Sequence, residues 1–87
     1  MDKFYLYNIT TVKIKIGNLV RIPKFLSYAS HSLWSNSQKN LHETNRAIGT
    51  WYPSDIALVI ERNECSIKIF TFRSSGWIKK EYCEIIS

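Results

Sequence analysis

The side chains best able to do chemistry in this chain are two histidines and the carboxylates near them in sequence. His31 and His42 are separated by eleven positions, with Glu43 and Asp55 nearby. An imidazole close to a carboxylate can act as a general base, but neither histidine accompanies a Ser or Cys in a nucleophile motif. We therefore predict no catalytic site. An enzyme that used His31 or His42 would need a pocket built by the surrounding segment.

The cysteines and glycines also lack a recognisable arrangement. Cys65 and Cys83 are not part of a Cys-x-x-Cys motif, and the histidines do not form a His-x3-His pair, so the sequence predicts no metal site. Both thiols are expected to be reduced and partly buried. Gly17, Gly49 and Gly76 stand singly, at expected turns, and make no phosphate-binding loop. We predict no cofactor.

A basic and aromatic stretch near the end of the chain has two interpretations. Phe70 and Phe72 stand beside Lys68 and Arg73, and the chain carries a formal net charge of +5. Exposed, these residues would make a stacking platform for nucleic acid. Alternatively, both rings pack under a long loop as part of a small core, which is the interpretation we favour. The nucleic-acid alternative would use Lys13, Lys15, Lys68, Phe70, Phe72 and Arg73.

Strands must position these groups, and the first half of the chain begins with one. Val12, Ile14 and Ile16 alternate with lysines, which is typical of a half-buried strand. The pair at 17–18 can adopt a sharp bend, and residues 19–22 resume the extended structure until Pro23 ends it.

The second half predicts a meander of strands. Residues 55–62 are apolar on both faces, as in a central strand, and a turn at 62–65 follows. In the next run Ile67, Ile69 and Thr71 occupy one face, while Lys68 and the two phenylalanines occupy the other. After a turn at 74–76 we expect a short strand at 77–78, a helical turn at 80–82 and a last strand at 84–86.

Residues 24–53 are rich in Ser and Asn and have no sustained periodicity, so they are expected to form a long loop. A short helix fits within 37–49, with Gly49 as its stop. Long loops in compact domains are commonly functional, and aromatic side chains dominate protein interfaces. The residues predicted to bind another protein are Tyr28, Trp34, Trp51 and Tyr52.

The order of these elements resembles a known family. The stretches "KIGNLVRIP" (15–23) and "ALVIERNECSIKIFTFRSSGWIKKEYCEIIS" (57–87) resemble the opening and ending of short SH3-like barrel proteins of tailed bacteriophages. The resemblance implies a mainly β domain spanning residues 1–87, a small barrel of about five strands with residues 24–53 as an insertion. Ala57 stands where such proteins often have Gly, and the insertion is longer than theirs.

The function expected from the resemblance is a non-enzymatic protein-binding module, foremost a virion accessory or decoration component present in multiple copies. An inhibitor of a host protein and a nucleic-acid-binding barrel are the alternatives. Its location would then be the virion or the host cytoplasm. No segment reaches the roughly eighteen consecutive apolar residues of a membrane-spanning helix, so no membrane partner is expected.

Overall fold

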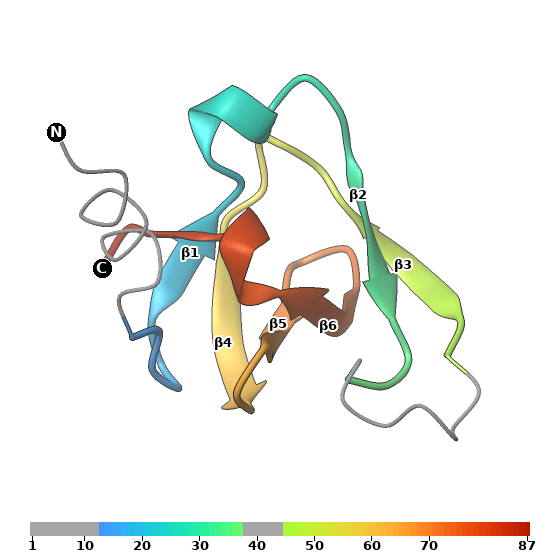
Figure 1. Ribbon diagram of the computed structural model, residues 1–87. Helices are drawn as coiled ribbons and strands as arrows, with labels where there is room; N and C mark the ends of the chain where they lie inside the picture. Colours follow the sequence, from blue (N-terminus) through green and yellow to red (C-terminus); the bar gives the residue numbers. More distant parts are fainter. Residues whose placement is uncertain (1–12, 38–44) are drawn as a thin grey trace, which may run out of the picture.

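The computed structural model describes residues 13–37 and 45–87, and these form one antiparallel sheet with two short 3-10 turns (Figure 1). Its seven strands are β1 (Leu19–Arg21), β2 (His31–Trp34), β3 (Ala47–Trp51), β4 (Ala57–Arg62), β5 (Ser66–Phe70), β6 (Ser75–Lys79) and β7 (Glu84–Ile85). The 3-10 turns are η1 (Lys24–Leu26) and η2 (Lys80–Tyr82).

The strand order across the sheet is β3-β2-β6-β5-β4-β1-β7, and all neighbours are antiparallel. The first and last strands of the chain pair with each other, through Val20 opposite Ile85 and Arg21 opposite Glu84. The sheet is open, because β3 and β7 form its two ends. In Figure 1 the β2–β3 hairpin lies on one side of the molecule, and β1 and β4 lie on the other.

Two of the expected turns have clear local causes. Gly17 has a φ of 97°, a left-handed conformation that a glycine adopts without strain, and the Asn18 side-chain oxygen accepts a hydrogen bond of 2.7 Å from the backbone of Lys15. At the β4–β5 hairpin the Asn63 side-chain oxygen accepts from the backbone N–H groups of Cys65 and Ser66. Asparagine favours turns through such bonds to its own neighbouring backbone.

One apolar core lies against the inner face of the strands. The expected face of β5 is confirmed, since Ile67 and Ile69 are fully buried. Burying each such side chain is worth about 1.5–3 kcal/mol. Burial also raises the pKa of the Cys83 thiol, so Cys83 stays protonated and behaves as a small apolar group. The core consists of Ile14, Val20, Ile22, Leu33, Trp51, Ala57, Val59, Ile67, Ile69, Ile78 and Cys83.

Residues 24–53 are not the structureless loop that was expected. They contribute η1, β2 and β3, which is why the described sheet has seven strands rather than five. The helix expected within 37–49 falls largely on residues 38–44, which lie outside the described residues, and residues 47–49 belong to β3. Tertiary contact with β6 places these two strands. Trp34 of β2 pairs with Trp77 of β6, and the two strands approach so closely that a Cβ added at Gly76 would lie 2.7 Å from the Leu33 Cβ.

Candidate interaction surface

A row of large apolar side chains crosses the outer face of the sheet. Leu19 is opposite Leu58, and Leu58 is opposite Phe70, so the three residues lie on the same face of β1, β4 and β5. Their exposed fractions are 38%, 38% and 55%. Their neighbours along β4 and β5, Ala57, Val59 and Ile69, are buried.

Two aromatic rings and a cation extend the row beyond the ends of the strands. Phe72, which is 78% exposed, follows β5 in the turn to β6, and Tyr52 follows β3. The Arg73 guanidinium carbon lies 4.6 Å from the centre of the Phe72 ring and 5.0 Å from that of Tyr52. Exposed Ile56 precedes β4 at the same end of the β4–β5 pair. Together these residues form the outer patch, which consists of Leu19, Tyr52, Ile56, Leu58, Phe70, Phe72 and Arg73.

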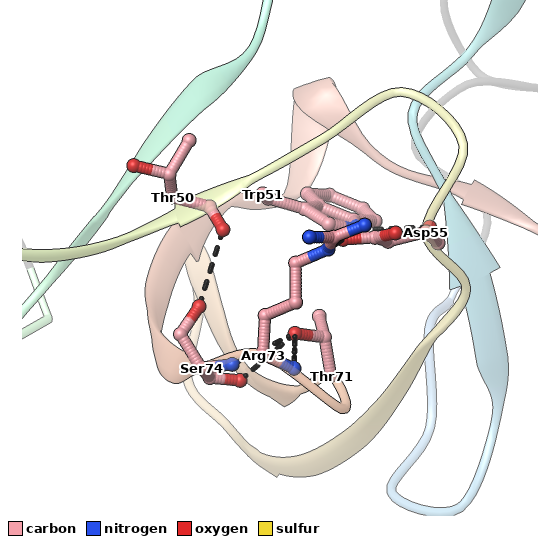
Figure 2. A network of polar contacts seen from close by, with 6 residues as sticks. All are labelled: Thr50, Trp51, Asp55, Thr71, Arg73 and Ser74. Atoms are coloured by element: carbon pink, nitrogen blue, oxygen red, sulfur yellow. Dashed lines mark hydrogen bonds and ion pairs between the residues drawn. The ribbon is translucent and has the colours of Figure 1, made fainter.

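A buried carboxylate holds the arginine in place. The Arg73 Nε donates a 3.0 Å hydrogen bond to the Asp55 Oδ2, and the Asp55 side chain is only 3% exposed. Asp55 is fixed in turn by its backbone: its carbonyl accepts from the Trp51 indole N–H at 3.0 Å, and its own N–H donates to the Tyr52 carbonyl. Figure 2 shows Arg73 reaching from its turn toward Asp55.

The turn that carries Phe72 and Arg73 is itself fixed. The Thr71 hydroxyl accepts from the backbone N–H groups of Arg73 and Ser74, both at 3.0 Å, and donates to the Ser74 carbonyl. The Ser74 hydroxyl donates to the Thr50 carbonyl at 3.1 Å, which ties the turn to β3 (Figure 2). The outer patch is therefore carried by three chain segments: β1, residues 52–58 and residues 70–73. Strand pairing joins β1 to β4 and β4 to β5.

The four residues predicted to bind protein do not gather at one place. Trp51 was expected to be an exposed anchor, and this is wrong: the last residue of β3 is fully buried in the core, where its indole N–H donates to the Asp55 carbonyl. Trp34 is half-buried opposite Trp77. Tyr28, in the segment between η1 and β2, is 82% exposed. Of the four, only Tyr52 belongs to the outer patch.

The favoured expectation for the phenylalanines is also wrong. Phe70 and Phe72 are 55% and 78% exposed rather than packed beneath the described residues 24–37 and 45–53, where the β2–β3 hairpin pairs with β6 instead. This satisfies one condition of the nucleic-acid alternative, which was their exposure.

The cations of that alternative are nevertheless dispersed. Lys13 and Lys15 flank Ile14, whose carbonyl accepts from Arg62 at the last residue of β4, the end opposite to the patch aromatics. Lys68 lies 3.7 Å from the carboxylate of Glu61, and Arg73 is paired with Asp55. The six residues thus do not form one cationic surface.

Of the two histidines, the structure describes only His31, which contacts the backbone and an aromatic ring. His31 Nε2 lies 3.3 Å from the Leu26 carbonyl, and its ring stacks on Tyr82 with the centres 5.3 Å apart. His42 and Glu43 lie outside the described residues. Within 13–37 and 45–87, no three His, Cys, Asp or Glu residues are grouped to hold a metal ion. Cys65 is exposed and Cys83 is buried.

A scan against protein-family models found no match, and searches of curated proteins and of solved structures found none either. The part of the chain that the structure describes contains no helix long and apolar enough to cross a membrane.

Sequence reasoning missed Leu19, Asp55, Ile56 and Leu58 as parts of the site. For Ile56 and Leu58 the available signal was that residues 55–62 are apolar on both faces. It was interpreted as a strand covered on two sides, whereas one of those sides is open.

Proposed function

We propose that this chain is a non-enzymatic module that binds another protein through the outer patch. The observation that carries the proposal is the exposure of large apolar side chains on one face of the sheet, next to turns that are held by hydrogen bonds. Small soluble proteins rarely expose contiguous apolar surface beyond a few hundred Å², and larger patches mark interaction sites. Tyrosine and arginine are also among the residues that contribute most to binding at protein interfaces.

The charges on this face favour protein over nucleic acid. Both cations beside the phenylalanines, Lys68 and Arg73, are paired with carboxylates. A polyanion gains affinity chiefly by releasing counterions as several phosphates are neutralised. Lys68 and Arg73 are the cations beside this face, and Lys13 and Lys15 lie toward the other end of β4, so few phosphates could be neutralised together, while the apolar area remains available to a protein.

The proposal also includes the fold and the biological assembly in which the chain acts. We propose an SH3-like barrel built by β1, β4, β5, β6 and β7, supported by the 3-10 turn before β7 and by the pairing of β7 with β1. The added β2–β3 hairpin and the open ends of the sheet are departures from a simple barrel. The setting we propose is a virion accessory component, with inhibition of a host protein as the alternative.

The experiment that tests binding compares two pairs of exposed aromatics. In one variant Phe70 and Phe72 become serine; in the matched control Phe25 and Tyr28, which are 71% and 82% exposed outside the patch, become serine. The tagged full chain is incubated with nuclease-treated extract of the source cells, and bound proteins are quantified by mass spectrometry. We expect a defined partner to be lost more than about tenfold with the patch variant only.

Equal loss with both variants, or no partner that distinguishes them, would contradict the proposal. The setting has a separate test, which is quantitative mass spectrometry of purified particles. A fixed copy number per particle supports an accessory component, whereas absence of the chain from particles favours the host inhibitor.

A further inference from the structure

We infer that Arg73 gives the outer patch a preference for a carboxylate, so that the bound protein segment carries an Asp or Glu side chain flanked by apolar residues. This inference rests on the proposed function and specifies the chemistry of its partner.

The Arg73 guanidinium has more N–H donors than its hydrogen bond to Asp55 uses. A guanidinium offers five N–H groups in a fixed fork, and Asp55 accepts from the Nε. No described residue accepts a hydrogen bond from the Nη atoms of Arg73, and about half of the side chain is exposed. These Nη groups are the part of the fork that a ligand on the outer patch can reach.

The position of the fork is set before any partner arrives. The Phe72 and Tyr52 rings lie within 4.6 and 5.0 Å of the guanidinium carbon, and the Asp55 carboxylate is buried behind it. Restricting the side chain in this way reduces the entropy that binding would otherwise cost. Planar, bidentate recognition of a carboxylate is the use for which arginine is best suited.

The composition of the patch identifies the complementary ligand. Arg73 is its only charged member, the acidic residue beside it is buried, and the chain as a whole has a net charge of +5. An approaching carboxylate thus meets a cation flanked by the Phe72 and Tyr52 rings, where displaced water strengthens the pairing. The apolar neighbours of that carboxylate in the partner would contact the rings and the Leu58–Phe70 pair.

The experiment is selection of peptides from a random display library against the full-length chain. Four forms are used in parallel: the unmodified chain, Arg73→Gln, Arg73→Lys and Phe72→Ser. We expect peptides selected by the unmodified chain to depend on Phe72 and to be enriched in Asp or Glu between apolar residues. Selection with Arg73→Gln should yield apolar peptides without that acidic enrichment.

A binding cycle then tests the contact itself. The best peptide is synthesised with its acidic residue and with the corresponding amide, Glu→Gln or Asp→Asn. We expect the amide to bind the unmodified chain about tenfold more weakly, and to bind Arg73→Gln within about twofold of the acidic peptide. Thermal unfolding confirms that each form is folded; should Arg73→Gln fail to fold, Arg73→Lys, which keeps the charge but not the fork, replaces it.

The outcomes separate the inference from the proposed function. Peptides that depend on Phe72 but lack acidic enrichment, or a cycle without coupling, would refute the role of Arg73 and leave the binding surface intact. If no selected peptide depends on Phe72, the proposed function itself fails. A single-stranded oligonucleotide that binds the chain in an Arg73-dependent way, with no peptide doing so, would replace the carboxylate with phosphate and overturn the inference.

Discussion

The two faces of the β4–β5 pair have similar composition and opposite environments. On the inner face Val59 is opposite Ile69, and both are essentially inaccessible to solvent; on the outer face Leu58 is opposite Phe70, and both are exposed. The alternation along each strand fixes which residues share a face. What distinguishes the faces is that the inner one is packed into the core, whereas on the outer one Leu58 and Phe70 remain 38% and 55% exposed.

This difference shows that apolar character alone assigns neither core nor binding surface. The inner face is filled by side chains from seven strands that converge on it, so changes there should affect the free energy of unfolding. The outer face contacts solvent in the isolated chain, so changes there should affect binding with little effect on stability. Substitutions of neighbouring residues on opposite faces test this distinction directly.

The largest effect is expected at the end of β3, where Trp51 is buried and Tyr52 is exposed. Trp51→Ala would leave a large cavity and an Asp55 carbonyl without its donor, and should lower the free energy of unfolding by about 3–5 kcal/mol. Tyr52→Ala removes a half-exposed ring and should cost about 0.5–1 kcal/mol, the value of its contact with Arg73. Urea unfolding followed by circular dichroism measures both. Similar losses for the two variants would contradict the separation of faces.

A smaller effect is expected where β6 approaches β2. Gly76→Ala places a Cβ 2.7 Å from the Leu33 Cβ and 3.1 Å from the Trp34 carbonyl oxygen, and such overpacking costs about 1–3 kcal/mol. The adjacent Ser75→Ala serves as the matched control, because Ser75 is only partly buried. If Gly76→Ala were as stable as the control in urea, the β2–β6 contact would not be the one that orders the hairpin.

Several elements near the ends of the chain were predictable, because their signals are local. The strand expected from the alternation at residues 12–16 was wrong: residues 13–15 are not in a strand, residues 16–17 form a turn, and Ile16 is 62% exposed. Alternation gave the buried face of β5, Gly17 gave the turn before β1, and the turn at Lys80–Tyr82 and the strand after it are both present. β2 and β3 were not predictable from the Ser- and Asn-rich segment that contains them. Their order depends on the pairing of β2 with β6, in which Trp34 is opposite Trp77, 43 positions further along the chain, and weak local propensity is readily overridden by such packing.

The candidate site was predictable only as residue types. Tyr52, Phe72 and Arg73 were each singled out, but they were assigned to two different functions. The contact that unites them links Asp55 to Arg73 across eighteen positions and depends on two turns meeting at one end of the sheet. Hydrophobic periodicity describes neighbours along the chain and composition describes only totals. Neither predicts that two distant turns contact each other.

A double-mutant cycle on this ion pair sharpens the comparison, because the pair joins the buried and exposed sides. Asp55→Asn and Arg73→Gln should each destabilise the fold, and the double variant should lose less than their sum by about 1 kcal/mol. The reason is that Arg73→Gln alone leaves a buried carboxylate without its charged partner. The cycle is measured by urea unfolding at constant salt. Strictly additive losses would show that the pair contributes no coupling to the fold.

The smallest effect on stability is expected at Phe70, although its side chain is larger than that of its neighbour Ile69. Phe70→Thr keeps a residue suited to a strand and removes mainly the cross-strand contact with Leu58, which is worth about 0.2–1 kcal/mol. Ile69→Thr puts a hydroxyl into the core and should cost several-fold more, because an unpaired buried hydroxyl adds its own penalty of about 1–3 kcal/mol to the lost packing. Equal urea midpoints for the two variants would mean that the outer face is covered after all. If Ile69→Thr is destabilised while Phe70→Thr keeps near-native stability, the exposed Phe70 ring contributes little to the fold. This is the expected result for a side chain that acts by contacting a binding partner.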